Sequence, residues 1–375
     1  LTSGMEGIYG FALGVTAETL VIFVILGCVL QEVGIGDYFY DLASAMCGKS
    51  RGGPAKVAVI SSALMGMVSG ETSANVATTG AFTIPLMKRI GYDKNFAGAV
   101  ECTASAGGQI LPPVMGATAF MVADTLNIPY SHLAVAALLP AILYYIACLI
   151  TVHFRAVRLE LVGDKAAKAD WNHLIKDSYL LLPIIGVVVL LCMNRTATFA
   201  AFWGGIMVAV VISFFKKETR ITPKKIVNIF VRAAKTTMTL GIATAIVGII
   251  VGSFSLTGIT MTISRVIFNA AGGRMFLTLF LTMIVAMILG MGMPTSAAYV
   301  LCSISAVPAL TTYLGLADLP ANLFVFYFGC MSTITPPVAT GAYAAAALSD
   351  GNPNKIGFMS MRLAIAGFIV PFIFI

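Results

Sequence analysis

Apolar runs of about twenty residues recur from one end of this chain to the other, separated by short polar segments. A helix needs about 20 consecutive apolar residues to cross the hydrocarbon core of a bilayer. Of the 375 residues, 59% are hydrophobic and only 10% are charged. A soluble domain carries about 25% charged residues, because its surface faces water. We therefore predict an all-α polytopic membrane protein.

Eight segments are expected to be single spans, namely 9–33, 95–126, 132–154, 178–193, 196–215, 236–254, 321–348 and 363–375. Two further regions, 54–90 and 275–314, each carry a polar cluster at the centre, SGETSANVATT and GMGMPTSAAYV. Each is either two complete spans with a tight turn or a re-entrant hairpin that returns to the same side. Segments 38–47 and 223–234 are predicted to be amphipathic helices at the membrane interface.

The distribution of Lys and Arg between the loops indicates which side of the membrane each loop occupies. With the loops on alternating sides, 20 of the 23 Lys and Arg residues fall on one side, including all those in 155–176 and 216–235. The other side has Arg195, Arg265 and Arg274. Because cytoplasmic loops carry the excess of basic residues, the first side is predicted to be cytoplasmic. The net charge of +7 then reflects orientation and contact with anionic lipid rather than nucleic-acid binding.

Two short motifs occur twice. ILPPV at 110–114 returns as ITPPV at 334–338, and TSANV at Thr72 returns as TSAAYV at Thr295, so the two shifts agree to one residue. This agreement predicts two copies of one unit. Five single spans separate the two hairpin regions, and an odd number turns the second copy upside down. The predicted units of this inverted repeat are 1–154 and 236–375, joined by cytoplasmic loops and scaffold helices in 155–235.

The proline pairs are predicted to break the spans 95–126 and 321–348. A proline inside a helix removes a hydrogen bond and clashes with the preceding turn, at a cost of about 3 kcal/mol. Lipid cannot satisfy the freed carbonyls, so an unwound segment is tolerated only where protein buries it or where it lines a polar cavity. A kink that merely aids packing is the alternative. Repetition beside two hydroxyl-rich hairpins favours a cavity.

The expected cavity suits an anion together with a monovalent cation. No Lys, Arg or His falls near the expected midplane. Free N–H groups at four helix starts would attract a carboxylate instead, near Thr72, after Pro113, near Thr295 and after Pro337. Helix-end carbonyls near Ile110 and Ile334, Ser and Thr hydroxyls and the amide oxygen of Asn75 would suit sodium.

Three of the acidic residues within or beside the expected spans and hairpins are candidates for a functional role. Glu71 lies at the first hairpin tip, where it is a candidate to bind a cation or relay a proton. Glu101 is interpreted as a capping or pairing residue, and Asp124 as a residue of the outer interface.

The segment 51–124, from RGGPAKVAVISSALMGMVSGETSANV to GGQILPPVMGATAFMVAD, closely resembles the large membrane subunit of TRAP transporters. The resemblance continues through GMGMPTSAAYV and STITPPVATGAYAAAALSDGNP and covers nearly the whole chain. It is nearest to the TAXI-associated type, in which the large and small membrane subunits are commonly fused. Because the chain starts at Leu1 without a methionine, we expect earlier sequence that includes the small-subunit helices.

The resemblance implies the permease of a tripartite secondary transporter in a prokaryotic inner membrane. A soluble TAXI-type binding protein on the periplasmic or extracytoplasmic side would deliver an organic acid, and a sodium gradient would drive uptake. Hairpins and broken helices would move as one block in an elevator mechanism. No cofactor is expected apart from sodium as the coupling ion.

By position, the resemblance implies one sodium site at Ser73 and Asn75 with 109–113, and another at Thr295 and Ser296 with 335–337. Ala298 stands where Asn75 stands in the first copy, so the two sites differ chemically. The candidate residues for sodium and substrate are Gly70, Glu71, Thr72, Ser73, Asn75, Gln109, Pro112 and Pro113 in the first copy. In the second copy they are Gly292, Pro294, Thr295, Ser296, Thr333, Thr335, Pro336, Pro337 and Thr340.

Three other classes were weighed. A channel also uses broken helices and re-entrant hairpins, but an inverted repeat within one chain favours alternating access. An intramembrane enzyme would need a catalytic constellation, and the chain has no HExxH, GxSxG or membrane histidine. A sodium/dicarboxylate carrier that works without a binding protein shares the hairpin architecture and stays open. The substrate also stays open among glutamate, 2-oxoglutarate, succinate-like and other acids.

Overall fold

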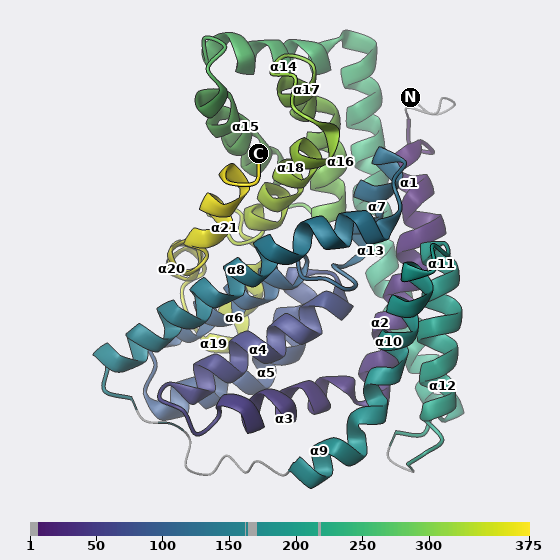
Figure 1. Cartoon of the computed structure of the whole chain (residues 1–375), viewed down its shortest axis with the longest axis vertical. Helices are drawn as coiled ribbons and strands as arrows, with labels where there is room; N and C mark the ends of the chain where they lie inside the picture. The colour runs from purple at the N-terminus through teal and green to yellow at the C-terminus, as the bar shows by residue number, and fades with distance from the viewer. Residues whose placement is uncertain (1–6, 162, 164–170, 217–218) are drawn as a thin grey trace.

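The computed structural model describes residues 7–375 apart from 162, 164–170 and 217–218 (Figure 1). Every regular element among these residues is helical, which confirms the all-α prediction. The gap at 162–170 falls in the charged loop that was predicted to be cytoplasmic, and most of that loop lies outside the described residues.

The helices of the first half are α1 (Phe11–Val15), the π-helix η1 (Thr16–Leu20), α2 (Val21–Val33), α3 (Ile35–Cys47), α4 (Gly53–Ser69), α5 (Thr72–Ile90), α6 (Lys94–Gly108), α7 (Ala117–Leu126) and α8 (Tyr130–Arg158). The middle of the chain forms α9 (Trp171–Asp177), the 3-10 helix η2 (Ser178–Leu181), α10 (Leu182–Cys192), α11 (Ala197–Phe199), the π-helix η3 (Ala200–Met207), α12 (Val208–Ile212) and α13 (Pro223–Thr257). The last part forms α14 (Ile259–Ala270), α15 (Met275–Gly290), α16 (Thr295–Ser305), α17 (Val307–Thr311), α18 (Asp318–Ser332), α19 (Thr340–Ser349), α20 (Pro353–Leu363), α21 (Ile365–Ile369) and the 3-10 helix η4 (Val370–Phe372).

Four helical stretches of the described chain are long and apolar enough to cross a membrane, namely Phe11–Val33, Tyr130–Arg158, Trp171–Cys192 and Pro223–Thr257. Large apolar side chains such as Leu139, Phe154 and Ile242 are more than 60% exposed on these stretches. Exposed apolar faces of this length belong in lipid, so the structure supports a polytopic membrane protein.

The helices around the two polar clusters and the two proline pairs begin and end close to the expected residues. Gly70 and Glu71 separate α4 from α5, and 291–294 separate α15 from α16. The first proline pair lies between α6 and α7, and the second lies between α18 and α19. The inverted relation of the two halves stays a prediction.

The first halves of the broken helices form the centre of the molecule. Every residue is buried from Phe96 to Ile110 in and after α6, and from Ala321 to Thr335 in and after α18. A helix buried on all sides is surrounded by other helices, because no face is left for lipid or water. The prolines therefore break helices that lie inside protein.

The second halves of the broken helices pack across the two halves of the chain. Helix α19 contacts α5 and α6, whereas α7 contacts α16 and α18. Figure 1 shows α19 beside α5 and α6 in the lower part of the molecule. This exchange brings each proline break toward elements from the other half of the chain.

Two sequence predictions about helix bounds are wrong. Segment 223–234 is not a separate interfacial helix, because it forms the start of the continuous 35-residue α13. A single span from Leu363 to the end is also wrong, because Leu363 ends α20 and the chain bends by 67° before α21. The other expected amphipathic helix lies within α3, which runs across the lower end of the molecule in Figure 1.

Candidate functional site

The predicted site residues fall on two hairpin tips and two helix breaks. At the first tip and the start of α5 are Gly70, Glu71, Thr72, Ser73 and Asn75, and in the first break are Gln109, Pro112 and Pro113. At the second tip and the start of α16 are Gly292, Pro294, Thr295 and Ser296. In and after the second break are Thr333, Thr335, Pro336, Pro337 and Thr340. The Pro112–Pro113 and Pro336–Pro337 peptide bonds are both cis.

The first tip packs directly against the first break, and two glycines allow the close contact. Gly70 has φ +71° and ends α4, and Gly116 has φ +70° and precedes α7. A Cβ on Gly116 would lie 2.6 Å from the Cα of Gly70. Both positions therefore need glycine, for the left-handed backbone and for the close approach. Beside them, the Ser73 hydroxyl donates to Glu71 at 2.6 Å.

Thr72 connects the first tip to both breaks. The amide Nε2 of Gln109 donates to the Thr72 hydroxyl at 2.8 Å, and this hydroxyl lies 3.1 Å from the hydroxyl of Thr333. Cys330 Sγ completes the chain at 3.5 Å from Gln109 Oε1. All four side chains are buried. Residues 261 positions apart thus meet in one polar cluster, which sequence spacing did not predict.

The second tip contacts the second break. The Gly292 N–H donates to the carbonyl of Val338 at 3.2 Å. The Ser332 hydroxyl donates to the carbonyl of Gly290 at 3.1 Å, just before the tip. Among the described residues no hydrogen bond joins the first tip to the second, so the breaks connect the two tips indirectly.

Three buried oxygens at the tips lack a hydrogen-bond partner in the described structure. They are Asn75 Oδ1, Thr295 Oγ1 and Ser296 Oγ, on side chains no more than 3% exposed. The other end of the Asn75 amide donates to the carbonyl of Ser62 at 2.8 Å, which orients the oxygen. Leaving a buried polar atom unpaired costs about 1–3 kcal/mol. Hydroxyl and amide oxygens are ligands for hard cations, so these residues fit a sodium ion.

The four helix starts at the tips and breaks are uncapped. Helices α5, α7, α16 and α19 begin after Glu71, Gly116, Pro294 and Ala339, and none of these residues makes a side-chain cap hydrogen bond. Elsewhere, Asp93 and Asn352 cap α6 and α20, whereas α8, α15 and α18 also begin without a side-chain cap. The Gly341 N–H at the start of α19 already donates to the carbonyl of Thr333. The N–H groups that remain free and the helix dipoles make the four starts suitable for an anion.

The carbonyls at the ends of α6 and α18 are less available than expected. The N–H groups of Gln109, Ile110 and Leu111 bond to the carbonyls of residues 106–108, and those of Thr333, Ile334 and Thr335 bond to 330–332. These tightened last turns satisfy the helix-end carbonyls. In the first break, the first carbonyl without such a bond is that of Gln109. In the second break, the Thr333 carbonyl accepts from the Gly341 N–H, so the first carbonyl without such a bond is that of Ile334.

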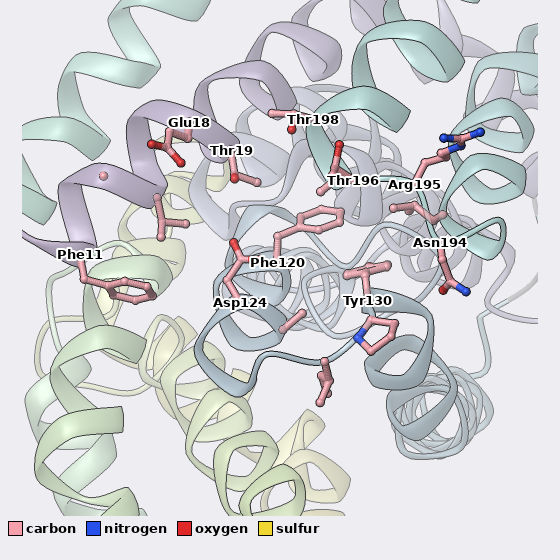
Figure 2. Close-up of a pocket in the computed structure, with 17 residues that line it drawn as sticks. Phe11, Glu18, Thr19, Phe120, Asp124, Tyr130, Asn194, Arg195, Thr196 and Thr198 are labelled. Atoms are coloured by element: carbon pink, nitrogen blue, oxygen red, sulfur yellow. The ribbon is translucent and has the colours of Figure 1, made fainter.

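A pocket of about 680 Å³ lies apart from this junction, between η1, α7, the start of α8 and the 194–198 segment (Figure 2). Glu18, Asp124 and Arg195 line it. Arg195 is one of the three basic residues of the predicted outer side. Asp124 is exposed beside this pocket, and its place at the outer interface stays a prediction.

Residues 5–375 match the family described as "Tripartite ATP-independent periplasmic transporter, DctM component". The chain belongs to this family. It is 25% identical over 358 residues to a putative TRAP transporter large permease protein of Haemophilus influenzae, covering 92% of this chain and 84% of that protein. A second protein of that name and organism is 28% identical over 249 residues, covering 65% of this chain and 55% of its own length.

A third relative of this DctM-family chain is the 2,3-diketo-L-gulonate TRAP transporter large permease protein of Escherichia coli. It is 24% identical over 330 residues, which cover 84% of this chain and 74% of that protein. The resemblance to TRAP large permeases is thus confirmed. Family and apolar helices together indicate a multi-pass protein of the bacterial inner membrane, in a family of transporter permeases rather than enzymes.

The buried Glu101 of this permease is held inside protein, as interpreted from the sequence. Its carboxylate accepts hydrogen bonds from four hydroxyls, those of Ser62, Thr79, Thr83 and Ser105. The sequence analysis missed the hydroxyl partners. The available signal was the spacing of Thr79 and Thr83, and of Glu101 and Ser105, four residues apart on one helix face.

Tyr130 is a further residue that the sequence analysis missed. Its hydroxyl lies 2.9 Å from the carbonyl of Pro113 and 2.7 Å from that of Val114, in the first break. Its ring stacks on Phe120 of α7 with centroids 4.2 Å apart. Tyr130 therefore supplies a donor that the unwound backbone needs.

Replacing Tyr130 with phenylalanine is expected to lower the free energy of unfolding by about 1–2 kcal/mol, because a buried carbonyl of the break loses its donor. Thermal unfolding of the purified protein measures this effect. Tyr343→Phe is the matched control, since Tyr343 is 49% exposed on α19. Equal shifts for the two variants would contradict the role of Tyr130.

Proposed function

We propose that this chain is the membrane permease of a tripartite, binding-protein-dependent secondary transporter that imports organic acids together with sodium by an elevator mechanism. The arrangement at the tips carries the proposal: four uncapped helix starts suit a carboxylate, and three unpartnered buried oxygens suit a cation. Bound sodium adds to the attraction for the carboxylate, and the carboxylate adds to the attraction for sodium. This mutual stabilisation couples the binding of sodium to the binding of the carboxylate.

The names of the relatives support an organic-acid substrate. One relative is a 2,3-diketo-L-gulonate permease, and the C4-dicarboxylate permease of Pseudomonas aeruginosa is 28% identical over 134 residues, which cover 36% of this chain and 31% of that protein. Both substrates are carboxylates. The proposed partners are a soluble TAXI-type binding protein and a small membrane subunit fused to the N-terminus.

The elevator step follows from charge. Substrate and sodium together are closer to neutral than either alone, and moving a net charge through a bilayer is costly. The loaded block of hairpins and broken helices therefore crosses, whereas the half-loaded block crosses poorly. The contact of α19 with α5 and α6 joins elements of both halves in one packed unit, which supports movement as a block.

Uptake of radiolabelled C4 and C5 organic acids into proteoliposomes tests this function. The intact membrane protein is assayed with and without its cognate binding protein, and with and without an inward sodium gradient. We expect uptake only when the binding protein and the inward sodium gradient are both present. Uptake without the binding protein would establish a direct carrier, and uptake driven by protons alone would refute sodium coupling and direct attention to Glu71.

Removing single unpartnered oxygens is expected to weaken the sodium response. Thr295→Val and Ser296→Ala should leave the fold intact, whereas Asn75→Ala also removes the buried hydrogen bond to the Ser62 carbonyl and should lower stability. For Asn75→Ala, Thr295→Val and Ser296→Ala, the sodium concentration for half-maximal uptake should rise about tenfold, the equivalent of one lost charge-assisted contact. Thr295→Val should also leave thermal stability unchanged or higher, because an unsatisfied buried hydroxyl disappears.

The matched control for these variants is Ser303→Ala on α16. Its hydroxyl donates at 2.9 Å to the carbonyl of Val300 on the same helix. The control should keep the sodium response of the unmodified protein. If the three tip variants also kept it, the assignment of the sodium sites would be wrong.

A further inference from the structure

A groove of about 400 Å³ lies between the last turns of α8 and the end of α20, on the side predicted to be cytoplasmic. Arg155 and Arg158 of α8 and Arg362 of α20 line it together with Phe96, Phe154 and Met359. Figure 1 shows the end of α8 reaching the lower left of the molecule, with α20 above it. The groove thus combines three cations with an apolar wall.

Within the described part of the chain, the three arginines have no acidic partner. No acidic side chain lines the groove, and no ion pair in the described part of the chain includes Arg155, Arg158 or Arg362. The half-buried Arg155 lies over the ring of Phe96, 5.4 Å from its centroid, and its buried Nε has no hydrogen-bond partner. A partly buried guanidinium group without a counter-charge, such as that of Arg155, gains from an anion, and the exposed Arg158 and Arg362 are free to contact the same anion.

Nearby groups do not neutralise the arginines. The phenol of Tyr92 lies in the segment between α5 and α6, and its ring stacks on Phe96 with centroids 5.5 Å apart. Burial raises the pKa of Tyr92 to about 12, so this phenol is uncharged at physiological pH. The arginines also occupy the last turns of their helices. There the helix dipole stabilises their positive charge, but the N–H donors of the guanidinium groups stay available for a hydrogen-bond acceptor.

The apolar wall of the groove favours a lipid over a free anion as the ligand. Phe154 is 65% exposed and lies one residue before Arg155, so an acyl chain along this ring would remain next to the cations. A free phosphate would pair with the arginines but leave the apolar wall uncovered. On the side predicted to be cytoplasmic, the membrane leaflet supplies anionic lipids, which juxtamembrane basic residues attract.

We propose that this groove binds one anionic phospholipid of the cytoplasmic leaflet, with its phosphate between Arg155, Arg158 and Arg362 and an acyl chain along Phe154 and Met359. The planar guanidinium group matches phosphate oxygens with paired N–H donors. The lipid bridges α8 to α20, and α20 in turn packs on the central α6. Lipid occupancy therefore stabilises the folded protein by mass action.

Native mass spectrometry of the intact membrane protein tests the proposal, with dioleoylphosphatidylglycerol and dioleoylphosphatidylcholine as probes. The groove variant combines Arg155→Gln, Arg158→Gln and Arg362→Gln. It should bind phosphatidylglycerol about 100-fold more weakly than the unmodified protein, because three basic contacts are lost. The matched control combines Arg220→Gln, Lys224→Gln and Lys235→Gln, three exposed basic residues before and within α13. This control should bind phosphatidylglycerol as the unmodified protein does.

Three results would overturn the proposal. Equal loss in the groove variant and the control would show a diffuse charge effect. Equal binding of phosphatidylcholine and phosphatidylglycerol would show an apolar groove without headgroup recognition. Displacement of phosphatidylglycerol by millimolar inorganic phosphate would show a free-anion site. If the triple groove variant fails to fold in phosphatidylcholine, the exposed single variant Arg362→Gln provides the same comparison.

Discussion

Replacing Gly108 with valine is expected to abolish the folded protein. A Cβ on Gly108 would lie 2.4 Å from the Cα of Gly66, and a Cβ on Gly66 would lie 2.8 Å from the Cα of Gly108. Both obstacles are backbone atoms of buried helices, so neither can turn away as a flexible side chain would. Overpacking a core costs about 1–3 kcal/mol and more where the backbone must move. The yield of monodisperse protein after purification should fall at least about tenfold.

Gly241→Ala is the control for this prediction. Gly241 lies in α13, and a Cβ there would meet nothing within 4 Å. Alanine has the higher helix propensity, so the control should fold at least as well as the unmodified protein. Normal yield and an unchanged thermal midpoint for Gly108→Val would show that α4 and α6 are not in this close contact.

Replacing Glu101 with alanine is expected to destabilise the protein by about 2–4 kcal/mol. The carboxylate is fully buried and accepts hydrogen bonds from four hydroxyls on α4, α5 and α6. Alanine leaves a cavity and removes the common acceptor of these hydroxyls. Ser105 has no other described acceptor, whereas Thr79 and Thr83 also bond to carbonyls of their own helix. Chemical unfolding in detergent measures the change.

Two further variants test the interpretation of the Glu101→Ala result. Glu101→Gln keeps the size and one acceptor oxygen, so about half of the loss is expected. Asp350→Asn removes an exposed carboxylate that pairs with Lys88 at 3.2 Å, and its effect should stay below about 1 kcal/mol. If Glu101→Ala were as mild as Asp350→Asn, the hydroxyl cluster would contribute little to the fold.

Local chemistry made several features predictable. The proline pairs predicted the breaks after α6 and α18, because a proline lacks the N–H that a helix needs. The polar clusters predicted the ends of α4 and α15, where Gly70 and Gly292 have the positive φ that favours glycine. Apolar length predicted the span Tyr130–Arg158, which begins two residues before the expected start at residue 132.

The two wrong helix predictions have separate causes. Lys and Arg in 223–234 suggested a helix lying on the membrane, but basic residues at the cytoplasmic end of a long upright helix give the same pattern. At the other end, the chain bends at Ala364 without a proline or glycine at that position. The apolar run of 363–375 does not report such a bend, because hydropathy measures composition and not helix direction.

The sequence by itself determined the membrane setting, the positions of the breaks and the family, since each depends on residues close together in the chain. Only the tertiary structure decided that Thr72 meets Thr333, that four hydroxyls surround Glu101, and that Arg155, Arg158 and Arg362 share one groove. In lipid, an apolar helix face has no fixed partner, because lipid tails are as apolar as the neighbouring helix. Close packing of glycines and the few buried polar groups therefore selects which helix faces meet, and that selection is made between residues far apart in the chain.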